Sequence, residues 1–240
     1  MDVNKNSYTF IFAFAMVVVV AAVLSFTASS LKERQKLNVE QEKKQSIIKS
    51  IGVDVSRGEA SAAYSKYITD AVIVQNNELA EGDAFEIRME KQVDKAPKER
   101  KAPLYIASKE GKRYFIIPLR GKGLWGPIWG YIALNEDLAS VYGATFDHKT
   151  ETPGLGAEIS TDEFQKQFED QRIMGPDGKF RSIAVKKGNA QGKYEVDGIS
   201  GGTITSNGVE NMLSDCLIAY VDFLKANAER LRSGKVAQIQ

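Results

Sequence analysis

The sequence predicts an α+β protein, in which a single N-terminal transmembrane helix precedes one domain with an antiparallel sheet and flanking helices. Three observations lead to this prediction. The chain begins with a long uncharged apolar run, its middle third contains closely spaced strand patterns, and an amphipathic helix pattern lies near its end. Because no repeat or flexible linker interrupts the rest, we divide the chain into residues 1–30 (N-terminal segment and transmembrane helix), 31–51 (helical stalk) and 52–240 (one domain).

The apolar run is long enough to cross a membrane. Residues 6–31 carry no charge, and the 21 residues of the core, 8–28, are predominantly apolar. A helix of that length covers about 31 Å, close to the roughly 30 Å of bilayer hydrocarbon. A cleaved signal peptide is the alternative, but its apolar region is normally only about 7–15 residues. We therefore expect an uncleaved single-span anchor.

The charges around the span give an ambiguous orientation. Lys5 precedes the span, whereas Lys32, Arg34 and Lys36 follow it. Read literally, the positive-inside rule puts the C-terminal domain in the cytoplasm, although the rule is weak when a long domain is translocated. The segment 31–51 is highly charged and rich in helix formers, so we expect the membrane helix to continue as a solvated stalk.

The domain begins after Gly52 and alternates helix and strand patterns. The clearest element is a hairpin over residues 104–121, in which two β-rich runs flank a turn that contains Gly111. The other expected elements are a short helix (56–68), strands at 71–75, 131–134 and 141–146, a helix at 161–173 with Thr161 as its N-cap, a second strand pair within 181–199, and a final helix from about 207 to 232.

Composition excludes several classes of function. The net charge of +1 lacks the basic excess that is typical of nucleic-acid binding. Cys216 is the only cysteine and His148 the only histidine, so an intrachain disulfide and a multi-cysteine or multi-histidine metal site are excluded. Cys216 falls on the apolar face of the final helix, which predicts a buried structural thiol. We expect His148 to be a solvated loop residue rather than a general base.

One glycine motif invites a dinucleotide-binding interpretation. GKGLWG, residues 121–126, matches GxGxxG and follows a strand pattern. That fingerprint requires a helix to start at the glycines, where its N-terminus meets the pyrophosphate. Pro127 follows at once and the next run is a strand pattern, so we reject a nicotinamide site. Trp125 and Trp129 form either a packed corner or an aromatic wall for a planar ligand.

A second glycine cluster, DGISGGTITSNGV (197–209), lies directly before the final helix. Asn207 and Glu210 resemble a capping box, which predicts that the helix begins near Asn207. A helix N-terminus preceded by flexible glycines is a favourable phosphate site. The residues alone leave open an ordinary glycine-rich turn, and they leave open which hydroxyl is functional: Thr203, Thr205 or Ser206.

A third segment, ETPGLG (151–156), combines a Pro–Gly turn with polar side chains. It is either a connecting turn or the edge of a polar ligand site.

Together these segments resemble a known family. DGISGGT resembles the covalent flavin-attachment motif of FMN-binding domains, Asp-x-x-Ser/Thr-Gly-Ala-Thr, and HKTETPGLGA and GKGLWGPIWGY resemble two other segments of such domains. With the anchor, the chain resembles the C-subunit family of sodium-translocating NADH:quinone oxidoreductases (Nqr) over nearly its full length. The alternatives are the homologous G subunit of the Rnf ferredoxin-oxidising complex and a non-redox membrane-anchored binding module.

The resemblance assigns roles to individual residues. Thr203 would carry FMN through a phosphoester, with Thr205 and Ser206 as the fallback acceptors. Gly202 stands where the motif has alanine, which loosens the loop. A separate flavin transferase would recognise Asp197, Ser200, Gly201, Gly202 and Thr203, and the remaining flavin contacts would come from Ser200, Gly201, Gly202, Glu151, Thr152, Leu155, Gly156 and Trp125. No catalytic acid or base and no metal is expected.

The resemblance also implies a function and a location. The chain would be a covalent-FMN electron-transfer subunit that relays electrons between neighbouring redox subunits, with no complete NADH or quinone site of its own. It would be a single-pass protein of the bacterial cytoplasmic (inner) membrane, with its C-terminal domain on the periplasmic side.

Overall fold

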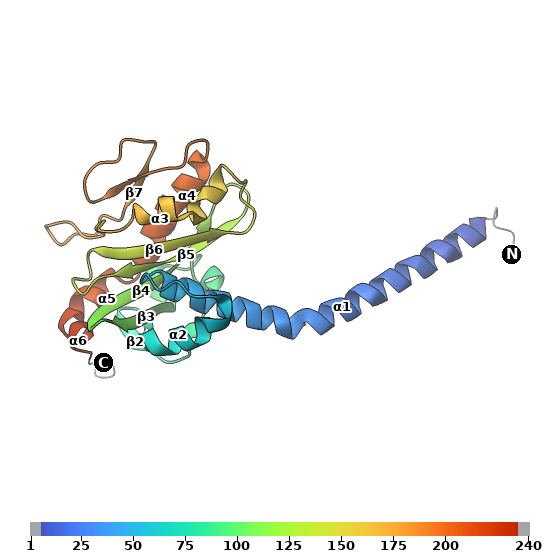
Figure 1. Cartoon of the computed structure of the whole chain (residues 1–240), viewed down its shortest axis with the longest axis horizontal. Helices are drawn as coiled ribbons and strands as arrows, with labels where there is room; N and C mark the ends of the chain where they lie inside the picture. The colour runs from blue at the N-terminus through green and yellow to red at the C-terminus, as the bar shows by residue number, and fades with distance from the viewer. Residues whose placement is uncertain (1–5, 235–240) are drawn as a thin grey trace. The chain divides into compact units, whose positions relative to one another are not determined.

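The computed structural model describes residues 6–234, which fall into two compact units with their boundary in the chain between Lys43 and Lys44. The first unit contains most of helix α1 (Asn6–Lys49). The second unit contains the last part of α1 and all other elements (Figure 1).

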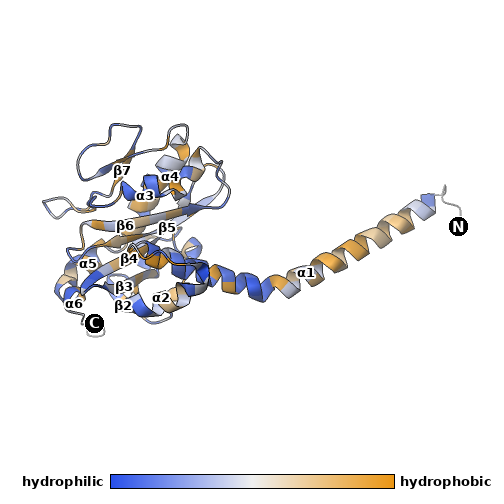
Figure 2. Ribbon diagram, in the orientation of Figure 1, coloured by the Kyte–Doolittle hydropathy of each residue, from blue (hydrophilic) through white to orange (hydrophobic). Residues whose placement is uncertain are grey.

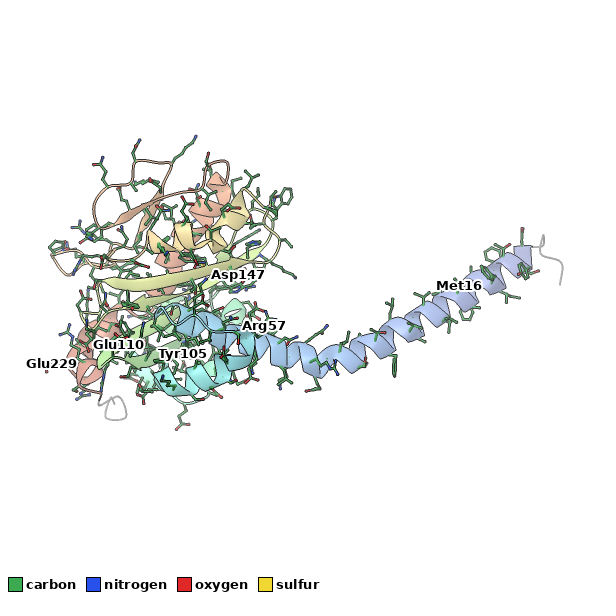
Figure 3. The ribbon with its side chains drawn as sticks, in the orientation of Figure 1. Met16, Arg57, Tyr105, Glu110, Asp147 and Glu229 are labelled. Carbon is green, nitrogen blue, oxygen red and sulfur yellow. The ribbon has the colours of Figure 1, made fainter. Side chains whose placement is uncertain are left out.

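Helix α1 is apolar over its N-terminal part and polar beyond it. An 18-residue window of the helix has a mean hydropathy of 2.7, and none of that window is buried. Figure 2 shows this part as a continuous hydrophobic stretch, and the Met16 side chain projects from it in Figure 3. Among the residues that the structure describes, α1 alone has the length and composition to cross a membrane. It fits the single-pass anchor expected from the sequence.

A six-stranded antiparallel sheet forms the centre of the second unit, in the order β2-β1-β3-β4-β5-β6. Two of its hairpins have two-residue turns, Asn76–Asn77 and Glu110–Gly111, in which both residues have positive φ. Turns of this kind match the twist of the strands. The strands are β1 Ile68–Gln75, β2 Glu78–Ala80, β3 Ala102–Lys109, β4 Lys112–Lys122, β5 Pro127–Leu134 and β6 Val141–His148.

The central strands are apolar along their length because both faces of the sheet are covered. On β4, Phe115 and Ile117 join the larger core, whereas Ile116 faces the smaller one. Ile47, from the end of α1, and Tyr105 also belong to the smaller core and are fully buried; Figure 3 labels Tyr105. This alternation follows from the two-residue period of a strand.

Short helices surround the sheet. Figure 1 shows α3, α4 and β7 near β5 and β6, and α2 near β3 and β2. The α-helices are α2 Ala60–Tyr67, α3 Asp162–Lys166, α4 Thr203–Leu217, α5 Val221–Ala226 and α6 Ala228–Ser233. The 3-10 turns are Arg57–Glu59, Ala84–Glu86, Met89–Lys91, Pro97–Glu99 and Gly156–Ser160.

Helix α4 lies against β4 with almost no space between the backbones. A Cβ atom at Gly208 would lie 2.4 Å from the carbonyl oxygen of Lys122, and one at Gly121 would lie 2.7 Å from Cβ of Met212. Only glycine permits this approach, which brings the start of α4 next to the end of β4 and the loop that follows it.

The final helix ends close to its predicted end, but it starts earlier and is interrupted twice. It begins at Thr203 rather than near Asn207, with Gly202 as N-cap and no side-chain cap. The predicted capping box is wrong because the Glu210 carboxylate accepts a hydrogen bond from the Val185 amide (2.7 Å). The pattern also breaks into α4, α5 and α6, with Asn227 at φ −113° between the last two.

Two other elements are shorter than expected. Thr161 caps α3 as predicted, but α3 ends at Lys166 because the chain then pairs with the start of β6. The Asp170 amide donates to the Val141 carbonyl (2.9 Å), with Asp170 at φ 62°. The second strand pair exists as β7 (Ala184–Lys186) and β8 (Glu195–Asp197), three residues each and parallel.

Candidate functional site

Three segments that are distant in the sequence line a cavity of about 240 Å³. They are the β4–β5 loop (123–126), the segment after β6 (151–156) and the start of α4 (201–205). Asp147, labelled in Figure 3, lies near the end of β6, from which the second segment leaves the sheet. We call this the Trp125 cavity, and it is lined by Leu124, Trp125, Glu151, Thr152, Leu155, Gly156, Gly201, Gly202, Thr203, Ile204 and Thr205.

The structure brings together all the residues that the resemblance assigned to the flavin except Ser200, which lines a neighbouring cavity instead. Asp197, which the resemblance assigned to recognition by the transferase, lines neither cavity. The Asp197 carboxylate accepts a hydrogen bond from the Ala190 amide (2.8 Å), and its backbone amide donates to the Gln167 side chain (2.9 Å). Asp197 therefore fixes the chain just before the glycine-rich loop.

Glu151 is the buried charged group of the Trp125 cavity and is only 5% exposed. Its Oε1 accepts a hydrogen bond from the Trp125 amide (2.8 Å), and its Oε2 accepts one from the Thr205 hydroxyl (2.6 Å). Burial alone would raise the pKa of Glu151, but the Thr205 hydroxyl and three backbone amides of the β4–β5 loop outweigh it and hold the pKa below its usual value. The carboxylate is therefore ionised at neutral pH.

The three candidate hydroxyls differ sharply in exposure. Thr205 and Ser206 are buried, at 1% and 4% exposed. The Thr205 hydroxyl donates to Glu151, and the Ser206 oxygen accepts from the Ile199 amide (3.0 Å). Thr203 is exposed at the first position of α4, and its hydroxyl has no hydrogen-bond partner within residues 6–234. The Thr203 hydroxyl is therefore accessible from solvent and is not engaged in a hydrogen bond within this range.

A second cavity, of about 330 Å³, lies on the other side of Thr203. We call it the Lys186 cavity. Its lining includes Lys186 and Lys187 as well as residues of the glycine-rich loop and the first turn of α4. Lys186 forms a long ion pair with Glu195 (3.7 Å), whereas no charged partner of Lys187 lies within the described range. Two lysines beside the N-terminus of a 15-residue helix make this side of Thr203 favourable for an anion.

Apolar side chains surround the mouth of the Trp125 cavity. Five large apolar side chains are exposed in the part of the second unit that the structure describes, and four of them line this cavity. They are Leu124 (46%), Trp125 (66%), Leu155 (42%) and Ile204 (57%). Exposed apolar groups gathered in one place commonly mark a binding site. Leu124 and Ile204 were not predicted as lining residues. Ile204 could have been recognised from the sequence as an apolar residue that lies outside the buried face of its helix.

The two tryptophans have different surroundings. Trp129 lies within β5 under the Arg120 guanidinium (5.4 Å from the ring centroid) and does not line the Trp125 cavity. The glycine motif at 121–126 forms the end of β4 and a tight loop, closed by the Gly123 amide on the Gly126 carbonyl (2.8 Å), and β5 follows. No helix starts there, which agrees with the rejection of a dinucleotide site.

Other reactive groups lie outside the cavity or are buried. Nδ1 of His148 accepts a hydrogen bond from the Glu151 amide (3.2 Å), so this histidine shapes the turn before the site. Cys216 is buried, and burial raises the pKa of its thiol to about 11. Within residues 6–234, no group of three or more His, Cys, Asp or Glu side chains could hold a metal ion.

Comparisons with known proteins place this chain in a family and match the part of it that contains the Trp125 cavity. Residues 123–218 match the model of the FMN-binding domain family, a span that contains every residue lining the Trp125 cavity. The C subunit of the Na(+)-translocating NADH-quinone reductase of Vibrio anguillarum is 30% identical over 209 residues, which cover 79% of this chain and 81% of the relative. The chain belongs to this C-subunit family.

Solved structures of the C-subunit family have the same fold. The crystal structure of the C subunit from Parabacteroides distasonis is 45% identical, with a TM-score of 0.75 over 81% of this chain and 96% of that chain. NqrC from Shewanella oneidensis, at 22% identity and a TM-score of 0.64, shows the likeness of fold alone. The relatives are C subunits of a Na(+)-translocating NADH-quinone reductase. Helix α1 of this chain fits a single-pass membrane anchor by its length and composition.

Proposed function

We propose that this chain carries FMN covalently on Thr203 and relays electrons between neighbouring redox subunits of a membrane-bound, sodium-translocating NADH:quinone oxidoreductase. One observation carries the proposal. Thr203 is the last residue of the attachment-like motif. Of the three candidate hydroxyls, it is the one that is exposed and makes no hydrogen bond within residues 6–234. It also lines both the Trp125 cavity and the Lys186 cavity. The burial of Thr205 and Ser206 argues against both fallback acceptors.

The Trp125 cavity fits the isoalloxazine ring. Its mouth is lined by an indole and three aliphatic side chains, which suit a planar apolar ring. Its volume of about 240 Å³ lies below the roughly 300–1,000 Å³ of cavities that enclose whole ligands. One edge of the ring would therefore stay accessible, as a group that exchanges electrons with partner subunits requires.

The Lys186 cavity fits the phosphate end. A phosphoester on Thr203 would place its charge beside the amides of the first turn of α4 and near Lys186 and Lys187. A bound flavin supplies one- and two-electron chemistry, and the chain supplies binding, orientation and electrostatics. We propose no catalytic acid or base in this chain.

Electrons would enter and leave through other subunits of the complex. The glycine motif that could suggest a nicotinamide site is a hairpin loop, so we propose that this chain has no complete NADH or quinone site. The Asp197–Thr203 segment would be recognised by a flavin transferase during maturation. Its exposed Ser200 and Gly201 are accessible for such recognition, while Asp197 would act by fixing the loop.

We propose that the domain lies on the periplasmic side of the inner membrane. The family resemblance puts attachment by the transferase there, and α1 provides one anchor. The charges after the span oppose this orientation, but loop-charge counting is weak for a domain of this length.

Attachment is tested by producing the full chain together with the flavin transferase. In wild type, we expect an intact mass higher by one FMN, mapped to the peptide that contains Thr203, and flavin fluorescence that survives denaturing electrophoresis. Thr203→Val removes the acceptor oxygen while keeping the side-chain size, and it should abolish both signals.

Ser160→Ala is the control, since it removes an exposed hydroxyl that lines neither cavity. The flavin content of this variant should equal that of wild type. Retained fluorescence in Thr203→Val would disprove the assignment of the acceptor. A colourless wild-type protein would favour a non-redox binding module.

A further inference from the structure

Glu151 joins two walls of the Trp125 cavity through its two oxygens. One oxygen binds the amide of Trp125 in the β4–β5 loop, and the other binds the hydroxyl of Thr205 in the first turn of α4, two residues beyond Thr203. At 5% exposure, the carboxylate is shielded from competing water. Hydrogen bonds to a buried carboxylate are stronger than neutral ones, so this link fixes the spacing of the walls.

The surrounding backbone leaves room for this carboxylate. A Cβ atom at Gly123 would lie 2.6 Å from Glu151 Oε1, and one at Gly156 would lie 2.4 Å from Oε2. Two segments therefore approach the carboxylate more closely than any side chain would allow. The Thr205 hydroxyl and three backbone amides of the β4–β5 loop occupy most of the roughly four acceptor positions of the carboxylate, so Glu151 is poorly placed to accept a hydrogen bond from a ligand.

The charge of Glu151 is balanced by hydrogen-bond donors rather than by a cation. Within residues 6–234, no Lys or Arg side chain forms an ion pair with it. Charge acts strongly across a water-poor interior. A ring in the Trp125 cavity would lie against this fixed negative charge, and adding electrons to the ring would meet its repulsion.

We propose that Glu151 is a positioning residue that holds the α4 turn bearing Thr203 against the Trp125 loop, and that its charge makes the attached flavin harder to reduce. The part that concerns the flavin rests on the proposed function. The part that concerns the two walls is a property of this chain alone and can be measured without FMN.

The charge is tested with Glu151→Gln in the full chain matured with the transferase. Glutamine keeps the size and an oxygen for the loop amides but removes the charge. In a titration with dithionite, the midpoint potential should rise. A tenfold change in the equilibrium corresponds to about 30 mV for a two-electron couple. A purely structural role would not move the potential in this direction.

Glu158→Gln is the matched control. Glu158 belongs to the same segment and accepts a hydrogen bond from the Gly154 amide (2.8 Å), but it does not line the Trp125 cavity. The midpoint potential of the flavin in Glu158→Gln should equal that in wild type. An unchanged potential in Glu151→Gln, or an equal rise in both variants, would overturn the electrostatic part.

The link between the walls is tested with Thr205→Val, which removes the hydroxyl and keeps the volume. Two results are expected. FMN attachment within a fixed maturation time should fall several-fold, and, in flavin-free protein, the fluorescence anisotropy of Trp125 should decrease. The second measurement uses a Trp129→Phe background, in which Trp125 is the single tryptophan. The potential of the fraction that carries FMN should not rise.

These measurements separate the two proposals. Wild type without FMN refutes the proposed function, while the anisotropy still tests the link. If Thr203→Val loses FMN but Thr205→Val attaches it at the wild-type rate with unchanged anisotropy, the link is refuted and the function stands. If Glu151→Gln does not fold, the two Thr205→Val measurements still decide whether the link between the walls exists.

Discussion

At the scale of single residues, the glycines of the site differ in what they contribute. Gly156 is required by contact, since a Cβ atom there would lie 2.4 Å from Glu151 Oε2 and 2.5 Å from the Thr205 hydroxyl. Gly201 is required by conformation, with φ +75°. Gly202, which replaces the alanine of the family motif, has φ −104°, and a Cβ atom there would meet Ile199 at 3.0 Å.

We expect Gly156→Ala to lower the free energy of unfolding by about 1–3 kcal/mol, because the new methyl group must push the buried carboxylate aside. Chemical denaturation followed by circular dichroism measures the change. Gly58→Ala is the control, since a Cβ atom at Gly58 has no neighbour within 4 Å. Equal stability of the two variants would show that the tight contact has no energetic weight.

Gly202→Ala should be tolerated, whereas Gly201→Ala should lower both stability and FMN attachment. Alanine adopts φ −104° without strain, but at φ +75° it costs about 1 kcal/mol. Ile199 has to shift by only a few tenths of an ångström to admit the methyl group at Gly202. Comparing unfolding and flavin content side by side would contradict this if Gly202→Ala were the more damaging variant.

The low pKa of Glu151 predicts a dependence of stability on acid. Its pKa is lower in the folded protein than the ordinary 4.5, so the unfolded state binds more protons as the pH falls. The contribution is fully present above about pH 4.5 and is lost as the pH falls through the folded pKa. Wild type should therefore lose stability more steeply than Glu151→Gln below about pH 4.5 in urea unfolding. If the two proteins lost stability equally as the pH fell, the low pKa of Glu151 in the folded protein would be contradicted.

At the scale of elements, the contact between α4 and β4 fixes the position of Thr203. Gly208 lies in mid-helix, where alanine would normally add about 1 kcal/mol through helix propensity. Here its Cβ atom would lie 2.4 Å from the Lys122 carbonyl, which belongs to the backbone of a central strand. The cost of this steric clash exceeds the stability that alanine would add through helix propensity.

Gly208→Ala should therefore destabilise the domain and reduce FMN attachment, because α4 must move away from β4 and carry Thr203 with it. A fall of several degrees in the thermal midpoint corresponds to roughly 1–3 kcal/mol for a domain of this size. A rise in the midpoint would mean that helix propensity dominates.

Most strands could be predicted from sequence, but the start of α4 could not. The apolar runs of β3, β4 and β5 identify strands because both faces are buried. Asn207 and Glu210 resemble a cap, yet Glu210 binds the distant Val185 amide, a tertiary contact that no local pattern contains. The sequence likewise could not show that Thr205 and Ser206 face inward, which depends on the true start of the helix.

At the scale of the whole molecule, the division of the chain suggests two separable parts. Residues 44–234 contain both hydrophobic cores and both cavities. We expect residues 44–240 alone to be soluble and to fold with the same chemical denaturation profile as the full chain in detergent. The full chain should sediment with membranes, whereas the shortened form should not. Aggregation of the shortened form would show that the domain depends on the anchor.

The family motif and the structure supply different parts of the candidate site. The motif selected Thr203 among three hydroxyls, and the geometry independently favours it by exposure. Leu124 and Ile204 were not predicted, because each is a single apolar residue in a polar or glycine-rich segment. The bridging role of Glu151 also needed the fold, since its partners lie 26 and 54 residues away in the chain.

The burial of Cys216 would matter if the domain lies outside the cytoplasm, as we propose. In an oxidising compartment, an exposed unpaired thiol would crosslink copies of the chain. With a pKa of about 11, the Cys216 thiol stays protonated and is a poor nucleophile, and the fold hides it from other chains. We therefore expect the native protein to react very slowly with maleimides. A cysteine introduced at exposed Lys112 would report which side of the membrane the domain faces, by labelling intact cells with an impermeant reagent.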